Sequence, residues 1–235
     1  MTPVTGYPLQ RFLRNHHWGA LMTTGGDRAE STLMSMAHAE REELAEFLAT
    51  LTPQQWQTSS LCDRWSVKEV VAHMMSCEEL GTIELLKRTA KGRGRNVRTN
   101  QIGVEEFADL EPDKLLAFLN NHLHPTGGNA RFGGMVALVD GTIHYQDIRR
   151  PLGRPRTIPA PRLKRVLHYV PRIPAIGARR RIRGLQLRAS DIEWTHGKGP
   201  EVTGTGEALL MAMAGRSSVA NELSGPGHDK FVERL

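Results

Sequence analysis

Residues 139–153, VDGTIHYQDIRRPLG, place an acid and an imidazole one helical turn apart. Asp140 stands four positions before His144, and Asp147 follows three positions later. Residues three or four apart lie on one face of a helix, so Asp140 and His144 can point at a single metal ion. Asp147, one turn further on, can accept the second ring N–H of His144 and fix its tautomer. The stretch therefore indicates a metal site with a supporting carboxylate.

A candidate for a third ligand is His73, which stands close to Val71 and Met74 in another amphipathic segment. A polar ring on an apolar helix stripe needs a partner. If the two helices pack side by side in a bundle, His73, Asp140 and His144 offer nitrogen, oxygen and nitrogen to one ion. Three protein ligands with an open position are typical of a catalytic zinc site. A lone histidine on an apolar helix face is more often a hydrogen-bonded core residue, and that alternative stays open here.

Four amphipathic segments before Pro151 predict the helices that would carry these residues. They cover residues 31–51, 66 to about 88, 111 to about 123, and 135–149. Ser66 and Glu69 have the spacing of a capping box at the start of the second helix. Four helices of this length with short to moderate connections predict a four-helix bundle. The segment KGRGRNVRTN, residues 91–100, is expected to be a basic loop.

Beyond Pro151 the chain becomes rich in proline and arginine. We expect a short helix near residues 161–169, strands within 185–194 and 198–204, and a closing helix that stops at Gly215. The expected fold class is therefore α+β. Residues 1–28 are interpreted as an N-terminal extension, residues 29–152 as the metal-binding helical bundle, and residues 153–235 as a small C-terminal α+β domain.

The composition is that of a soluble globular protein, with 39% hydrophobic and 24% charged residues among 235. No apolar run approaches the roughly 18 residues of a membrane helix, and the N-terminus lacks the apolar core of a signal peptide. We therefore expect a cytoplasmic protein, a monomer or homodimer, with no membrane partner. Cys62 and Cys77 do not form a CxxC pair and are interpreted as reduced thiols.

Positive charge is concentrated at the C-terminal end. The net charge is +6, and residues 151–235 hold 15 Lys and Arg against 7 Asp and Glu. Such a field favours anionic partners, which include nucleic acid, an acidic membrane surface and a small carboxylate substrate. Charge alone does not choose among them. The basic runs at 91–98 and 179–183, KGRGRNVR and RRRIR, are interpreted as solvated loops.

Three motifs in order give the chain a resemblance to a known family. They are LTPQQWQTSSLCDRWSVKEVVAHM at 51–74, VDGTIHYQDIRRPLG at 139–153, and LRASDIEWTHGKGPEVTGTGEALLMAMAGR at 187–216. With these motifs the chain resembles the mycothiol-dependent maleylpyruvate isomerase family, part of the DinB-like superfamily of metal-binding four-helix bundles. The resemblance extends from about Ser31 to the end of the chain.

The resemblance implies that His73, Asp140 and His144 bind Zn²⁺ or another divalent metal. The family commonly has Glu where this chain has Asp140, so the shorter side chain must bring its helix closer to the ion or bind through water. The family's cofactor is mycothiol, a low-molecular-weight thiol whose thiolate binds the metal and attacks a small electrophile. The expected activity is therefore isomerisation or S-transfer on a small anionic substrate.

An anionic substrate and a sugar-containing thiol both call for cations at the site. The resemblance points to Arg216 as a catalytic, substrate-contacting residue, with helix capping or a surface ion pair as the alternative. Arg149 and Arg188 are candidates for cofactor binding, and Arg150 is a further candidate cation. Cys62 is not expected to be catalytic.

A non-enzymatic alternative remains in view. The bundle could hold a metal for stability or sensing while the basic C-terminal part docks an anionic partner such as nucleic acid. Because three ligands leave an open coordination position, the enzyme is favoured, and nucleic acid is not expected as the partner.

Overall fold

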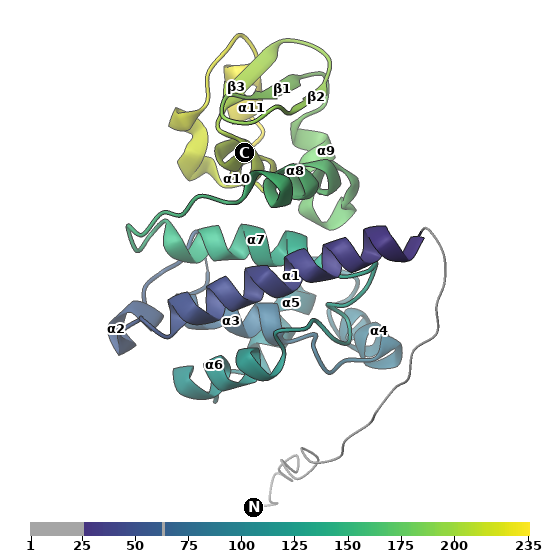
Figure 1. The fold of residues 1–235 in the computed structure, drawn as a ribbon, viewed down its shortest axis with the longest axis vertical. Helices are drawn as coiled ribbons and strands as arrows, with labels where there is room; N and C mark the ends of the chain where they lie inside the picture. Colours follow the sequence, from purple (N-terminus) through teal and green to yellow (C-terminus); the bar gives the residue numbers. More distant parts are fainter. Residues whose placement is uncertain (1–25, 63) are drawn as a thin grey trace, which may run out of the picture.

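The structure is a computed structural model that describes residues 26–62 and 64–235. Most of the predicted N-terminal extension, residues 1–25, lies outside the described residues. Figure 1 shows helices α1 to α7 in one part of the molecule, with a small sheet and helices α8 to α11 stacked on it. The predicted α+β fold class is confirmed.

Helices α1 to α7 make up the first part. They are α1 (Gly26–Leu48), α2 (Pro53–Trp56), α3 (Val67–Met75), α4 (Thr82–Lys91), α5 (Asn96–Glu105), α6 (Pro112–Asn121) and α7 (Met135–Arg149). Helix α1 packs against α6 and α7, and α3 packs against the same two helices. These four form the bundle that the apolar periodicity predicts.

The predicted second helix, residues 66 to about 88, is in fact two helices. Helix α3 starts with the predicted capping box of Ser66 and Glu69 but ends at Met75. Helix α4 starts after Gly81, and Arg88 near its end donates to Ser76 Oγ at 3.2 Å. The chain therefore folds back where the sequence pattern predicts a continuous helix.

The segment predicted as a basic loop, residues 91–100, contains the first turn of α5. Helix α5 packs against α3 and α4. Trp65 Nε1 donates to Gln101 Oε1 at 3.1 Å, which ties α5 to the start of α3. The loop prediction is therefore wrong for its second half, because contacts from elsewhere in the chain stabilise a helix that the local sequence does not reveal.

Helix α7 is the central element of the molecule. It packs against α1 and α3 on one side and against α8 on the other. Most of its side chains between Ala137 and Ile148 are buried, including the polar Thr142, Gln146 and Asp147. A helix covered on all sides places its polar side chains inside the protein, where they need partners.

The C-terminal part is built on three short strands. The strands are β1 (Gln186–Ala189), β2 (Thr195–Gly197) and β3 (Glu201–Gly204), and the helices are α8 (Ala160–Tyr169), α9 (Ala178–Arg181), α10 (Gly206–Met213) and α11 (His228–Val232). Strand β1 lies in the middle, antiparallel to β2 and parallel to β3. The single strand predicted within 185–194 thus corresponds to β1 and a turn, and β2 begins after it.

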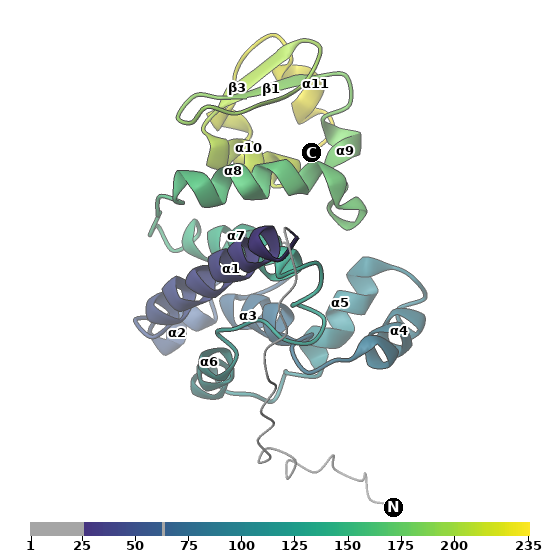
Figure 2. The ribbon, with the colours of Figure 1, turned by 45° about the vertical axis from the view of Figure 1, so that its right-hand side comes forward.

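The two parts share one interface. Helix α8 lies across α1 and α7 (Figure 2), and one hydrophobic cluster includes Leu33 of α1, Leu138 of α7 and Val166 of α8. Glu40 of α1, almost fully buried, pairs with Arg156 and Arg162 from the start of the C-terminal part. None of the helices in the described part of the chain has the length and apolarity of a membrane span.

Candidate metal centre

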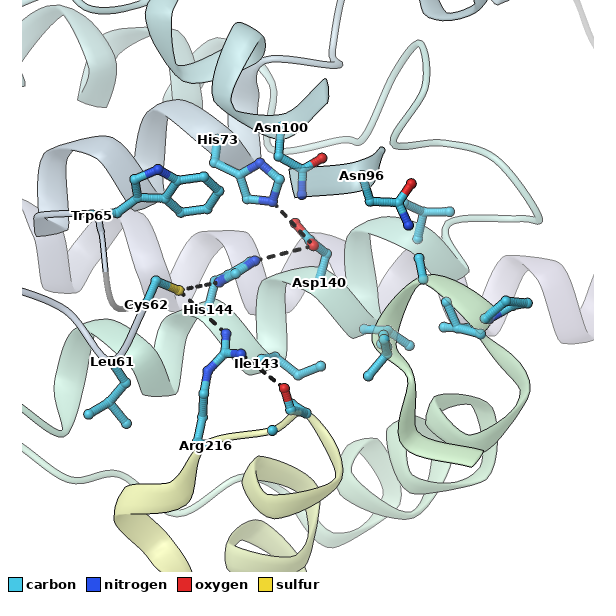
Figure 3. A pocket seen from close by; sticks show the side chains of 18 of the residues that line it. Leu61, Cys62, Trp65, His73, Asn96, Asn100, Asp140, Ile143, His144 and Arg216 are labelled. Atoms are coloured by element: carbon cyan, nitrogen blue, oxygen red, sulfur yellow. Dashed lines mark hydrogen bonds and ion pairs between the residues drawn. The ribbon is translucent and has the colours of Figure 1, made fainter. Parts of the chain in front are cut away.

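The three predicted ligands meet on the wall of a cavity (Figure 3). His73 comes from α3, whereas Asp140 and His144 come from consecutive turns of α7. Asp140 Oδ1 lies 3.4 Å from His144 Nε2 and 3.7 Å from His73 Nε2. Two helices far apart in sequence thus direct both imidazoles at one carboxylate oxygen.

The donor atoms have the separation that a metal ion requires. One atom from each of the three side chains lies within 4.8 Å of the other two. Ligand atoms about 2.1 Å from a tetrahedral ion lie roughly 3.4 Å from one another, close to the two distances found here. Asp140, although short, reaches both rings directly. The residues present therefore fit a divalent metal.

His144 is held in one orientation by Asp147. Its Nδ1 donates to Asp147 Oδ2 at 2.9 Å, as the sequence spacing predicts. Asp147 is fully buried and ionised, so it accepts this hydrogen bond and leaves Nε2 to face Asp140. Either a proton or a metal ion must lie between Nε2 and the carboxylate of Asp140.

The pKa shifts of His144 and Asp140 also show that the site favours positive charge. Burial would lower the pKa of His144, but the charge of Asp140 outweighs it and raises that pKa well above its usual value. Partial burial would raise the pKa of Asp140, yet the imidazoles of His144 and His73 hold it well below its usual range. The site stabilises positive charge between these groups.

Asp147 is in turn held by Arg216, which follows α10 in the C-terminal part. Arg216 Nε donates to Asp147 Oδ1 at 2.8 Å, and Nη2 donates to Oδ2 at 2.5 Å. Burial would raise the pKa of Asp147, but the hydrogen bonds from Arg216 and His144 keep it below its usual range. The structure thus places the predicted catalytic Arg216 at the site, with its charge paired to a carboxylate.

Cys62, for which the sequence predicts a place near the start of α3 but no catalytic role, lies at the site. Its Sγ lies 3.1 Å from Asp147 Oδ2, 3.5 Å from His144 Nδ1 and 3.4 Å from Arg216 Nη2. With His144 and Asp147 it forms a second group that could hold a metal. However, Arg216 already occupies both oxygens of Asp147. The available signal was its position just before the capping box of the helix that carries His73.

Arg149 and Arg188 do not line the cavity. Arg149 donates from Nη1 to the Tyr145 hydroxyl at 2.9 Å, and its guanidinium lies 4.2 Å from the ring centre of Phe47. Arg188 is exposed on β1 and pairs with Glu201 at 2.7 Å. Each has its partner away from the cavity, and a cofactor-binding role for either stays a prediction. Arg150 pairs with two glutamates, Glu207 and Glu222.

The cavity has a volume of about 990 Å³ and lies where α3, α5 and α7 meet the C-terminal part. Asn96 and Asn100 of α5 line it near the candidate metal ligands, as Figure 3 shows. The sequence reasoning missed both, since it predicted this segment as a loop. Arg181, Ser217 and Ser218 line it from the C-terminal part.

Comparison with known proteins supports the same family. Residues 37–124 match the family model described as the mycothiol maleylpyruvate isomerase N-terminal domain. A crystal structure of the mycothiol-dependent maleylpyruvate isomerase aligns with a TM-score of 0.55 and 15% identity, over 88% of this chain and 97% of that one. A histidine-to-alanine mutant of that enzyme aligns with a TM-score of 0.54 and 14% identity, over the same shares. Among curated proteins, none matches the sequence significantly.

At this level of identity, the solved structures establish the fold and the family model establishes the domain. The resemblance given by the three sequence motifs is thereby confirmed. Residues 37–124 belong to the mycothiol maleylpyruvate isomerase N-terminal domain family, and the chain around them has the fold of the mycothiol-dependent maleylpyruvate isomerase.

Proposed function

We propose that this protein is a cytoplasmic, zinc-dependent enzyme that uses mycothiol on a small anionic electrophile. The mycothiol thiolate either isomerises the electrophile or displaces a leaving group from it to form an S-conjugate. His73, Asp140 and His144 hold the metal. The proposal is carried by one observation, the convergence of both Nε2 atoms on Asp140 Oδ1 at the wall of the cavity. Three ligands leave at least one coordination position for the thiol.

A zinc ion bound here would lower the pKa of a coordinated thiol, so that the thiolate forms at neutral pH. The protein's own residues prepare the site for it. Asp147 holds the Nδ1 proton of His144 and directs the Nε2 lone pair at the metal position. Arg216 keeps Asp147 ionised and fixed. The bundle and the C-terminal part therefore both contribute to one site.

The cavity suits a thiol cofactor together with a small substrate. Its volume of about 990 Å³ is at the upper end of what small-molecule sites occupy. The amides of Asn96 and Asn100 offer neutral donors and acceptors for a sugar-bearing thiol. Of the two reactions, isomerisation is the one named for the solved structures that share this fold.

The test is metal analysis combined with thiol titration. The purified protein is assayed for bound zinc, and mycothiol binding is then measured by calorimetry with and without a chelator. We expect about one zinc per chain and thiol binding that the chelator abolishes. His144→Ala should lose both, whereas His168→Ala, a change at an exposed ring on α8, should lose neither. Tight zinc binding without a thiol response, accompanied by salt-sensitive DNA binding, would favour the non-enzymatic alternative.

A further inference from the structure

One arginine of the RRRIR run turns inward. Arg179 and Arg180 are exposed, as expected for a solvated segment, but Arg181 lines the cavity that holds the metal ligands. It lies at the end of α9, and the C-terminal end of α10 is beside it. The sequence gives no sign of this difference, because the three arginines are adjacent and identical in type.

Backbone carbonyls hold the guanidinium of Arg181 in place. Its Nη1 donates to Ile176 O at 2.7 Å and to Met213 O at 2.9 Å. Its Nε is buried and has no hydrogen-bond partner among the described residues. No carboxylate among the side chains that the structure describes forms an ion pair with it. The guanidinium of Arg181 is thus held in place through Nη1, whereas its Nε–H group lacks an acceptor among the described residues.

The candidate cations singled out from the sequence are already neutralised, and Arg172, which also lines the cavity, is exposed and donates to His168 O. Arg216 is paired with Asp147, Arg150 with two glutamates, and Arg188 with Glu201. An anionic substrate would have to compete with these carboxylates for the same donors. Arg181 has no such competitor, so its charge is available to a ligand in the cavity.

Gly215 lets the backbone pass close to this guanidinium. A Cβ at position 215 would lie 2.6 Å from Arg181 Nη2 and 2.9 Å from its Cζ. The glycine also has a φ of +89°, which residues with a side chain rarely adopt. The backbone between α10 and Arg216 thus packs against the guanidinium at a place where any side chain would displace it.

The surroundings of Arg181 disfavour its charge in the absence of a ligand. Burial, followed by the like charges of Arg180 and Arg216, lowers the pKa of Arg181, although a guanidinium stays protonated at neutral pH. A partly buried cation of this kind gains more from an incoming anion than a solvated one does, because the interaction is less screened.

From these contacts we propose that Arg181 is the anion-binding residue of the cavity and takes a carboxylate of the substrate. Arg216 is then a positioning residue that acts through Asp147. The inference rests on the proposed function for the identity of the substrate, but not for the existence of the anion site. It narrows the substrate class to small electrophiles that carry a carboxylate, the group that a guanidinium binds best.

The test uses succinate, an unreactive dicarboxylate, and succinamide, its uncharged analogue. Binding of each to the full-length, metal-containing protein is measured by calorimetry without mycothiol. We expect wild type to bind succinate and not succinamide, and Arg181→Gln to bind succinate at least tenfold more weakly. The matched control is Arg180→Gln, which removes the same charge from an exposed neighbour and should change the affinity less than twofold. Equal weakening by both variants would overturn the proposal, as would no succinate binding by wild type.

A second variant guards against loss of folding. Arg181→Lys keeps the positive charge but loses the paired N–H donors of the guanidinium. It should therefore still weaken succinate binding at least threefold, while its melting temperature stays close to that of wild type. Wild-type affinity in that variant would contradict a guanidinium-specific site. Because mycothiol is absent, Arg181-dependent succinate binding would survive a failure of the proposed thiol chemistry. Conversely, if mycothiol binds but succinate binding does not depend on Arg181, only the proposed anion site is refuted.

Discussion

His144 Nδ1 donates to the buried carboxylate of Asp147 at 2.9 Å, and Nε2 of the same ring faces Asp140 Oδ1 at 3.4 Å. The same carboxylate accepts two hydrogen bonds from Arg216 of the C-terminal part. Asp147 is not one of the three proposed metal ligands, but through these hydrogen bonds it links His144 to the C-terminal part.

Replacing Asp147 by Asn should weaken zinc binding about 10–100-fold, the usual effect of losing the acid behind a ligating histidine. The amide no longer requires the Nδ1 tautomer, so the ring can turn its lone pair away from the metal. Affinity is measured by competition with a chromophoric chelator. Asp191→Asn is the control, since Asp191 Oδ1 accepts from Gly206 N at the start of α10. Unchanged zinc affinity in Asp147→Asn would refute the orienting role.

Replacing Arg216 by Met should destabilise the fold by about 3 kcal/mol, because it leaves the fully buried Asp147 without its main partner. The free energy of unfolding is measured in urea. Adding Asp147→Asn to Arg216→Met should recover part of the loss, since the buried charge is then removed as well. Strictly additive losses in the double variant would show that the two residues are not coupled.

Replacing Cys62 by Ala should leave zinc stoichiometry unchanged. Cys62 belongs to the second possible metal group, with His144 and Asp147, but Arg216 already occupies the carboxylate of that group. Asp140→Asn should instead lower zinc affinity at least tenfold, because it removes the only charged ligand of the proposed set. Metal analysis of the two variants side by side separates the groups. The opposite pattern would move the ion to the cysteine.

The bundle could be predicted from apolar periodicity, but the break between α3 and α4 could not. Ile83 and Leu86 continue the helical pattern of α3, yet both are 64% exposed on α4. The pattern therefore reported amphipathic spacing and not burial. Helix α5 was missed for the complementary reason, since contacts with distant residues stabilise it and its own sequence is basic and polar.

The local part of the site was visible in the sequence because its members share one helix. Asp140, His144 and Asp147 lie three and four positions apart, and the structure has them as that spacing predicts. Cys62 and Arg181 reach the cavity only through tertiary packing. For Cys62 the local signal is its position just before the capping box of α3, whereas the arginines adjacent to Arg181 are exposed.

The C-terminal part should show a pH dependence of its own, which His196 contributes. Burial, then the charges of Arg172 and His168, lowers the pKa of His196. Below its usual value of about 6.5 the unfolded chain binds more protons than the folded one, so stability falls as the pH drops. Urea unfolding at about pH 7.5 and about pH 5.5 should therefore show a smaller loss for His196→Gln than for wild type.

His228 provides the opposite sign as a control. A hydrogen bond to Asp229 raises the pKa of His228, so this ring stabilises the fold at low pH and loses that contribution as the pH rises through the folded value. His228→Gln should thus lose more stability than wild type between the same two pH values. Identical pH slopes for both variants and wild type would contradict these assignments.

The central claim is that a thiol reaches a metal held by His73, Asp140 and His144. Cobalt(II) in place of zinc reports this directly, because a thiolate bound to cobalt gives a charge-transfer band in the near ultraviolet. Titrating mycothiol into the cobalt protein should produce that band with about one equivalent, and His144→Ala should not produce it. A spectrum that shows bound cobalt but stays unchanged by mycothiol would contradict the account.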